Sequence, residues 1–231
     1  MQGNSATGPG GGVLRIAGGG IYAESGDVVI NDSSLRDNTT TLGRGGAVAT
    51  ASGFLSLTDS AVVGNNAFHG GGIATQSGQI NVLRSELSAN VADGSGGGLY
   101  GETGDVTLIQ SVVATNRGYS TGGIHMDGGN LTLQFCVVSG NSSDFTGGIS
   151  WRGGFNTPGT RFLMEHSQVI GNRGEGPREG GGLGLAGDAT VSHSIVSANS
   201  VHYKGSPFGG GISHSIGTLT INDRKSLLRL F

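Results

Sequence analysis

The feature that most constrains this chain is an internal repeat. One copy runs from Gly18 to Asn38 as GGGIYAESGDVVINDSSLRDN, and the same order of Gly, apolar, Ser and Asn positions returns along most of the sequence. The copies are 25–27 residues apart where no insertion intervenes, a period typical of solenoids. Their first apolar positions are Ile21, Val48, Ile73, Leu99, Ile124, Ile149, Leu183 and Ile212.

Each copy contains short segments in which apolar residues alternate with small polar ones. This period of two is typical of β-strands, and the flanking Gly, Asn, Asp and Ser residues favour turns. A unit of three such strands cannot bury its apolar face alone, but stacked units can bury a continuous core. The sequence therefore predicts an all-β, right-handed parallel β-helix of about eight coils over residues 18–222, because parallel crossovers are almost always right-handed.

The ends of the chain fit the repeat less well. Residues 1–17 have the composition of a partial coil or a cap, and residues 223–231 read as a C-terminal tail or cap. Because exposed end coils normally need covering, we expect neighbouring segments of a longer parent chain.

Seven copies of the repeat end in an Asn residue. At strand spacing, these side-chain amides can bond to one another as a ladder. The predicted ladder comprises Asn38, Asn65, Asn90, Asn116, Asn141, Asn172 and Asn199. A Ser precedes each of these residues by five positions, except that Cys136 takes the place of Ser in one copy.

Composition excludes several classes of protein. The chain has 231 residues, 48 of them Gly, and a net charge of −3, so it lacks the positive field that nucleic-acid binding requires. No apolar run predicts a membrane-spanning segment, and a single Cys forms neither a disulfide framework nor a metal cluster. The G-x-G-x-x-G strings at Gly96 and Gly182 precede predicted strands rather than helices, so we expect no nucleotide cofactor.

One outward position collects titratable residues in successive coils. β-Helix enzymes that degrade pectin gather acids and bases on one outer face, so this position is the place to look for catalysis. Adjacent carboxylates would shift each other's proton affinity, and His residues could act as acids or bases. The candidates are Asp32, Asp59, His166, His193 and Asp223. Another repeat position, three residues after the first apolar residue of each copy, brings Glu102 beside Asp127, followed by Arg152. The simpler interpretation is that these polar side chains only face solvent, because spacing alone does not show that they converge on one site.

An insertion of about six residues interrupts the copy that starts at Ile149. It runs from Trp151 to Pro158 and holds the only Trp of the chain. Exposed rings on a protruding loop can stack on sugars, which makes Trp151, Arg152 and Phe155 candidate ligand-binding residues. The alternative is that these rings fold back over the coil surface, since bare aromatic rings are unusual.

The repeat resembles those of a known family. The openings Gly45-Gly46-Ala47-Val48 and Gly71-Gly72-Ile73, each followed by a segment that ends in Asn, resemble the repeats of chlamydial polymorphic outer membrane proteins and related bacterial right-handed β-helix proteins. The resemblance covers about residues 18–221 and implies a secreted or surface-displayed, outer-membrane-associated passenger segment that functions in adhesion. That family usually has Phe where this chain has Leu35 or Val62.

The sequence thus supports two functional hypotheses. The first is a non-enzymatic structural or adhesive segment that binds glycans or cell-surface proteins, without cofactor, metal or nucleic acid. The alternative is a polysaccharide-active lyase or hydrolase, or a fragment of one. A convergent cluster of acids with Lys or Arg on one face would favour the enzyme.

Overall fold

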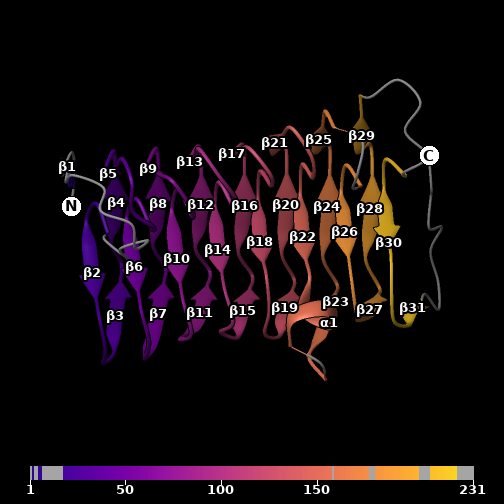
Figure 1. Cartoon of the computed structure of the whole chain (residues 1–231), viewed down its shortest axis with the longest axis horizontal. Helices are drawn as coiled ribbons and strands as arrows, with labels where there is room; N and C mark the ends of the chain where they lie inside the picture. The colour runs from indigo at the N-terminus through magenta and orange to yellow at the C-terminus, as the bar shows by residue number, and fades with distance from the viewer. Residues whose placement is uncertain are drawn as a thin grey trace.

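The computed structural model describes residues 2, 5–6, 18–157, 159–176, 180–202 and 209–222. It is a parallel β-solenoid of about seven turns, and its coils advance from the N-terminal to the C-terminal end of the rod in Figure 1. Every paired strand is parallel to its neighbours, and each sheet takes one strand from each coil. The predicted all-β fold is confirmed. The repeat predicted three strands per coil, whereas the structure has a fourth of only two residues, too short to show alternation in the sequence.

We number the four sheets in the order in which a coil visits them. Sheet I contains β2 (Ile21–Ala23), β6 (Val48–Thr50), β10 (Ile73–Thr75), β14 (Leu99–Gly101), β18 (Ile124–Met126), β22 (Ile149–Trp151), β26 (Leu183–Leu185) and β30 (Ile212–His214). Sheet II contains β3 (Val28–Asn31), β7 (Phe54–Thr58), β11 (Gln79–Leu83), β15 (Val106–Ile109), β19 (Leu131–Gln134), β23 (Arg161–Glu165), β27 (Asp188–Ser192) and β31 (Leu219–Asn222).

The other two sheets complete each coil. Sheet III contains β4 (Ser34–Arg36), β8 (Ala61–Val63), β12 (Glu86–Ser88), β16 (Val112–Ala114), β20 (Val137–Ser139), β24 (Gln168–Ile170) and β28 (Ile195–Ser197). Sheet IV contains the two-residue strands β1 (Ser5–Ala6), β5 (Thr39–Thr40), β9 (Asn66–Ala67), β13 (Val91–Ala92), β17 (Arg117–Gly118), β21 (Ser142–Ser143), β25 (Arg173–Gly174) and β29 (Ser200–Val201).

The core consists of apolar columns that run along the solenoid axis. In sheet I the first strand residues stack in register from Ile21 through Val48 and Ile73 to Ile212, which confirms the predicted column. The inner members are fully buried, while Ile21 and Ile212 are partly buried because each has a coil on one side only among the described residues. Stacking therefore supplies the burial that a single coil lacks.

The insertion lies between the sheet I and sheet II strands of its coil, as predicted. It contains one helical turn, α1 (Gly153–Asn156), which projects from the side of the rod in Figure 1. Pro158 lies outside the described residues, as do most of residues 1–17 and all of residues 223–231. Among the helices that the structure describes, none is long and apolar enough to cross a membrane.

The predicted Asn ladder is present and buried. Each side-chain Nδ2 donates to the Oδ1 of the next Asn along the axis at 2.9–3.0 Å, from Asn38 to Asn199. The same Oδ1 accepts the backbone N–H of the preceding ladder residue. The ladder thereby satisfies turn backbone groups that would otherwise be buried without partners.

We predict that Asn116→Ala lowers the free energy of unfolding by about 1–3 kcal/mol. The side chain of Asn116 takes part in four hydrogen bonds, with Asn90, Leu87 and Asn141, and its removal leaves buried partners unpaired. Chemical denaturation measures the change. The control Asn81→Ala, on the exposed side of β11, is expected to change stability by less than about 0.5 kcal/mol, and equal effects of the two variants would contradict the prediction.

A second ladder uses the Ser that precedes the sheet III strand. The backbone N–H of Ser60 donates to the Oγ of Ser85, and that of Cys136 donates to the Oγ of Ser167, each at 3.0 Å. Cys136 fits this series because its Sγ donates to the carbonyl of Gln134, as the neighbouring Ser hydroxyls do within their own coils. The cysteine is buried, as predicted.

Cys136 is expected to react slowly with thiol reagents while the protein is folded. Burial raises the pKa of its thiol and shields the sulfur, so little thiolate is available. Labelling with a chromogenic disulfide reagent, with and without denaturant, measures the two rates. Equal rates in both conditions would show that the thiol is accessible in the native protein.

Candidate functional site

Two turn positions in every coil have left-handed backbone conformation. One precedes the ladder Asn and carries mostly small residues: Asp37, Gly64, Ala89, Thr115, Gly140, Gly171 and Ala198. The other joins sheet II to sheet III and carries polar or aromatic side chains with φ between 46° and 55°: Asp32, Asp59, Arg84, Gln110, Phe135, His166 and His193. We call this second series the outer column. A left-handed conformation costs a non-Gly residue about 1–2 kcal/mol, yet the outer column has no Gly among the described residues.

We predict that Ala89→Gly stabilises the protein by about 0.5–1 kcal/mol, because Gly tolerates φ of 53° without steric cost. The matched control is Ala74→Gly, which changes a buried strand residue and is expected to destabilise by at least about 0.5 kcal/mol. Thermal unfolding compares the three proteins. A loss of stability in Ala89→Gly would argue against strain at this turn.

The first half of the outer column is charged. Arg84 donates to both carboxylate oxygens of Asp59, from Nε at 2.7 Å and from an Nη at 2.6 Å. The hydrogen bond from Arg84 lowers the pKa of the Asp59 carboxyl, so Asp59 is ionised at neutral pH and is a poor proton donor. These side chains line a shallow groove along the edge of sheet III, together with Asp32, Glu86 and Gln110.

The second half of the outer column is aromatic. The rings of Phe135 and His166 stack with centroids 5.0 Å apart, and those of His166 and His193 stack at 4.8 Å. Phe135 is 57% exposed and His193 is also exposed. The stack forms a continuous edge of rings open to solvent along the solenoid axis.

The catalytic candidates predicted from the sequence do not converge. Asp59 and His166 are separated along the column by Arg84, Gln110 and Phe135, hence by four coil steps. At the usual strand spacing of about 4.8 Å, this places the backbones of the two residues about 19 Å apart. Asp32 lies one coil farther away than Asp59, and Asp223 lies outside the described residues. Among the described residues, the outer column therefore separates the acids from the imidazoles.

The three candidate ligand-binding residues of the insertion have different environments. Trp151 is the last residue of β22 and points into the core, fully buried, where its Nε1 donates to the carbonyl of Gly129 at 2.9 Å and its ring packs near Phe162. Its indole therefore has no face open to a sugar. The equivalent positions hold Thr50 and Thr75 in early copies but the apolar residues Met126 and Leu185 in the two flanking copies, and this apolar pair was the available sign of an inward direction. Arg152 is partly buried, and Phe155 is 58% exposed on α1.

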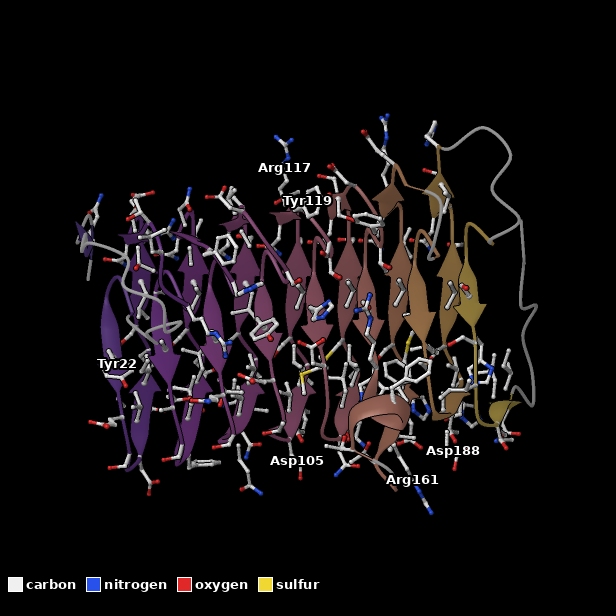
Figure 2. The ribbon with its side chains drawn as sticks, viewed as in Figure 1. Tyr22, Asp105, Arg117, Tyr119, Arg161 and Asp188 are labelled. Carbon is white, nitrogen blue, oxygen red and sulfur yellow. The ribbon has the colours of Figure 1, made fainter. Side chains whose placement is uncertain are left out.

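A convergent polar cluster that the sequence did not reveal lies on the outer face of sheet I. It comprises Arg44, His69, Tyr100, Glu102, His125, Asp127 and Arg152, and we call it the sheet I cluster. Sheet I crosses the middle of the rod in Figure 1. The central residue of each sheet I strand points outward, and Tyr22, labelled in Figure 2, is the first of these residues. It aligns in register with Ala49, Ala74, Tyr100 and His125. Only the adjacency of Glu102, Asp127 and Arg152 was visible in the repeat. Arg44 and His69 come from turns before β6 and β10, and register alone does not tell how far their side chains reach.

Rings form the base of the sheet I cluster. His69 stacks on Tyr100 with centroids 4.8 Å apart, and Tyr100 stacks on His125 at 5.7 Å. The guanidinium carbon of Arg44 lies 5.2 Å from the centroid of the Tyr100 ring, and Arg44 forms an ion pair with Glu102. Tyr100 and His125 are buried, whereas the Glu102 and Asp127 side chains keep 35% and 32% of their surface exposed.

Burial and hydrogen bonds shift the pKa values of three side chains in this cluster. Burial alone would raise the pKa of Asp127, but His125 at 3.0 Å and the Tyr100 hydroxyl at 2.7 Å lower it to about 2. Burial raises the pKa of Tyr100, and burial with nearby Arg44 lowers the pKa of His69 to about 4. His69 Nδ1 accepts the backbone N–H of Ser95 at 3.0 Å, as a neutral imidazole can. The pKa values of Asp127, Tyr100 and His69 are all shifted away from neutral pH. Acid–base catalysis at neutral pH requires groups whose pKa lies near 7.

We predict that the protein loses stability between about pH 6.5 and 4, partly through His69. In this window the unfolded chain binds a proton at His69 that the folded protein does not bind, because the folded pKa is lowered to about 4. Stability then falls with decreasing pH, by up to about 1.4 kcal/mol per pH unit from this group. His69→Gln should flatten the slope in urea denaturation at pH 4–7, whereas His193→Gln, an exposed control, should not. Identical slopes in wild type and His69→Gln would refute the assignment.

Comparisons with known proteins add no family to this picture. No family model matches the chain, and no match was found among curated proteins or solved structures. In the part of the chain that the structure describes, no group of three or more His, Cys, Asp or Glu residues could hold a metal ion.

Proposed function

We propose that this chain is a non-enzymatic, adhesive β-solenoid segment that binds an extended glycan along its outer column. The observation that carries the proposal is the contrast between the two left-handed turns. One uses Gly or Ala in five of its seven described coils, while the described outer column has neither and places polar and aromatic side chains at positions where Gly would relieve strain. Strain of this kind, once observed, points to a function for the side chains.

The chemistry of the outer column suits a carbohydrate. The exposed Phe135 ring offers apolar surface to a sugar, while the imidazole nitrogens of His166 and His193 and the Asp59–Arg84 pair offer hydrogen-bond partners to hydroxyl groups. Both halves follow the solenoid axis, so a polymer lying along the rod would meet one side chain per coil. Many modest contacts of this type add through multivalency.

The resemblance to chlamydial polymorphic outer membrane protein repeats supports the same proposal. It suggests a secreted or surface-displayed bacterial protein, associated with the outer membrane, in which the rigid rod presents its binding edge to glycans or cell-surface proteins. The stacked register and the Asn ladder suit such a stalk, because they hold the outer column straight over many coils.

The polysaccharide-active enzyme remains the competing hypothesis. The sheet I cluster is convergent, as an enzyme would need, but Tyr100 and His125 are buried and the resolved pKa shifts favour inert protonation states. In the outer column, Asp32 and Asp59 lie too far from His166 and His193 for an acid and an imidazole to act on one bond. We therefore favour binding over turnover.

Binding of polysaccharides by the purified chain tests the proposal. We expect affinity electrophoresis and calorimetry against a panel of neutral and acidic polysaccharides to find a ligand whose affinity falls about tenfold, or about 1.4 kcal/mol, in Phe135→Ala and in His166→Ala. Tyr119→Ala removes an aromatic residue of similar exposure on another turn and serves as the control.

Assays for reducing ends and unsaturated products accompany the binding measurements. The proposal expects no product from pectin, alginate or the other polysaccharides. Turnover that disappears in Asp59→Asn, His166→Ala or His193→Ala would make the enzyme hypothesis correct. Binding that is lost equally in Tyr119→Ala would show that the outer column is not the site.

A further inference from the structure

A groove on the outer face of sheet II belongs neither to the outer column nor to the sheet I cluster. It has a volume of about 470 Å³ and crosses β19, β23, β27 and β31. Arg161 and Asp188, the first residues of β23 and β27, line it and are exposed, and Figure 2 labels both at the same edge of the rod. The floor is a row of outward side chains aligned in register: Thr132, Leu163, Thr190 and Thr220.

Arg161 and Asp188 carry opposite charges on adjacent coils but do not pair with each other. They are register partners across β23 and β27, and within the described part of the chain the Arg161 guanidinium has neither an ion pair nor a hydrogen bond. In the outer column, by contrast, Arg84 and Asp59 are also one coil apart and form an ion pair at 2.6 Å. The backbone N–H of Thr218 donates to Asp188 Oδ1 at 2.9 Å, which orients the carboxylate and leaves its second oxygen available. A guanidinium and a carboxylate are thus both open to a partner at this groove.

These two charges restrict what fits the groove. A ligand that is only anionic would meet the Asp188 carboxylate, and one that is only cationic would meet the Arg161 guanidinium. A partner that pairs with both carries the opposite charges in the opposite order, one coil step of about 4.8 Å apart. A second copy of this chain presents that arrangement when its rod runs in the opposite direction.

A twofold axis describes this contact between two copies. The axis lies in the interface, parallel to the strands and midway between β23 and β27. Rotation about it exchanges the two coils, so Arg161 of each copy meets Asp188 of the other, as in an isologous interface. The long Arg161 side chains fill part of the facing grooves, and their apolar stems cover Leu163. Such an interface closes at two molecules.

We propose that the groove on sheet II is the interface of a symmetric dimer of this chain with antiparallel rods. Two Arg161–Asp188 ion pairs between the copies hold the dimer together. The contact covers only four strands of each copy, so the dimer is weak, with a dissociation constant on the order of 10–100 μM. The inference goes beyond the proposed function, because the dimer would give a polymer two binding edges instead of one.

Charge reversal tests the contact between the copies. Sedimentation velocity of the purified chain from about 5 to 500 μM should show a monomer–dimer equilibrium that shifts toward monomer at high salt. Arg161→Asp and Asp188→Arg each place like charges opposite one another and should weaken the dimer at least tenfold. An equal mixture of the two variants restores both ion pairs and should dimerise as the wild type does, which no effect within one chain can produce. A monomer at every concentration, or a mixture that stays monomeric, would overturn the proposal.

Two further variants locate the interface and guard against misfolding. Leu163→Arg adds bulk and charge to the outward floor of the groove and leaves the Asp188–Thr218 hydrogen bond in place, so circular dichroism should show it folded and sedimentation should show it monomeric. The control Arg173→Asp breaks an exposed ion pair on sheet IV and should dimerise as the wild type does. Loss of the dimer in Arg173→Asp, or its persistence in Leu163→Arg, would place the contact elsewhere and overturn the inference. Polysaccharide binding by a monomer would leave the proposed function standing.

Discussion

Hydrogen bonding between coils is the constraint on which the rest of this structure depends. The strands are parallel and stacked, so backbone N–H and C=O groups point along the axis and find their partners in the coils before and after. A residue is therefore held beside its equivalents about one repeat away in sequence. The Asn ladder extends this rule to side chains, since each amide bridges consecutive coils through Asn90, Asn116 and Asn141.

The same constraint explains which features could be predicted from the sequence. Positions such as Ile73 and Asn116 lie in regular columns, so alternation and repeat spacing were enough to predict their burial and stacking. The two-residue strands of sheet IV carry too little alternation to be recognised. Trp151 was misleading because it sits both at the end of a strand and at the start of an insertion, and the structure assigns it to the strand.

The sheet I cluster was harder to predict for a different physical reason. Repeat spacing gives the coil and the face of a side chain, but not the reach of a long side chain that starts in a turn. Arg44 begins before β6 and pairs with Glu102, which follows β14, so it crosses two coil steps. The partners of His125 and Asp127 likewise depend on rotamers that only the packed structure reveals.

The two faces illustrate opposite uses of polar residues in a solenoid. In the sheet I cluster, Tyr100 and His125 hold the Asp127 carboxylate through hydrogen bonds that keep its pKa well below neutral pH. In the outer column, Phe135 and its neighbours remain exposed at a strained turn, where Gly would make each coil more stable. Because the turn recurs in every coil, its strain accumulates with the length of the rod, while the proposed binding edge lengthens in the same proportion. If the outer column binds a polymer as we propose, a longer rod gains affinity only as long as the core and the ladders of each added coil outweigh the strain of its turn.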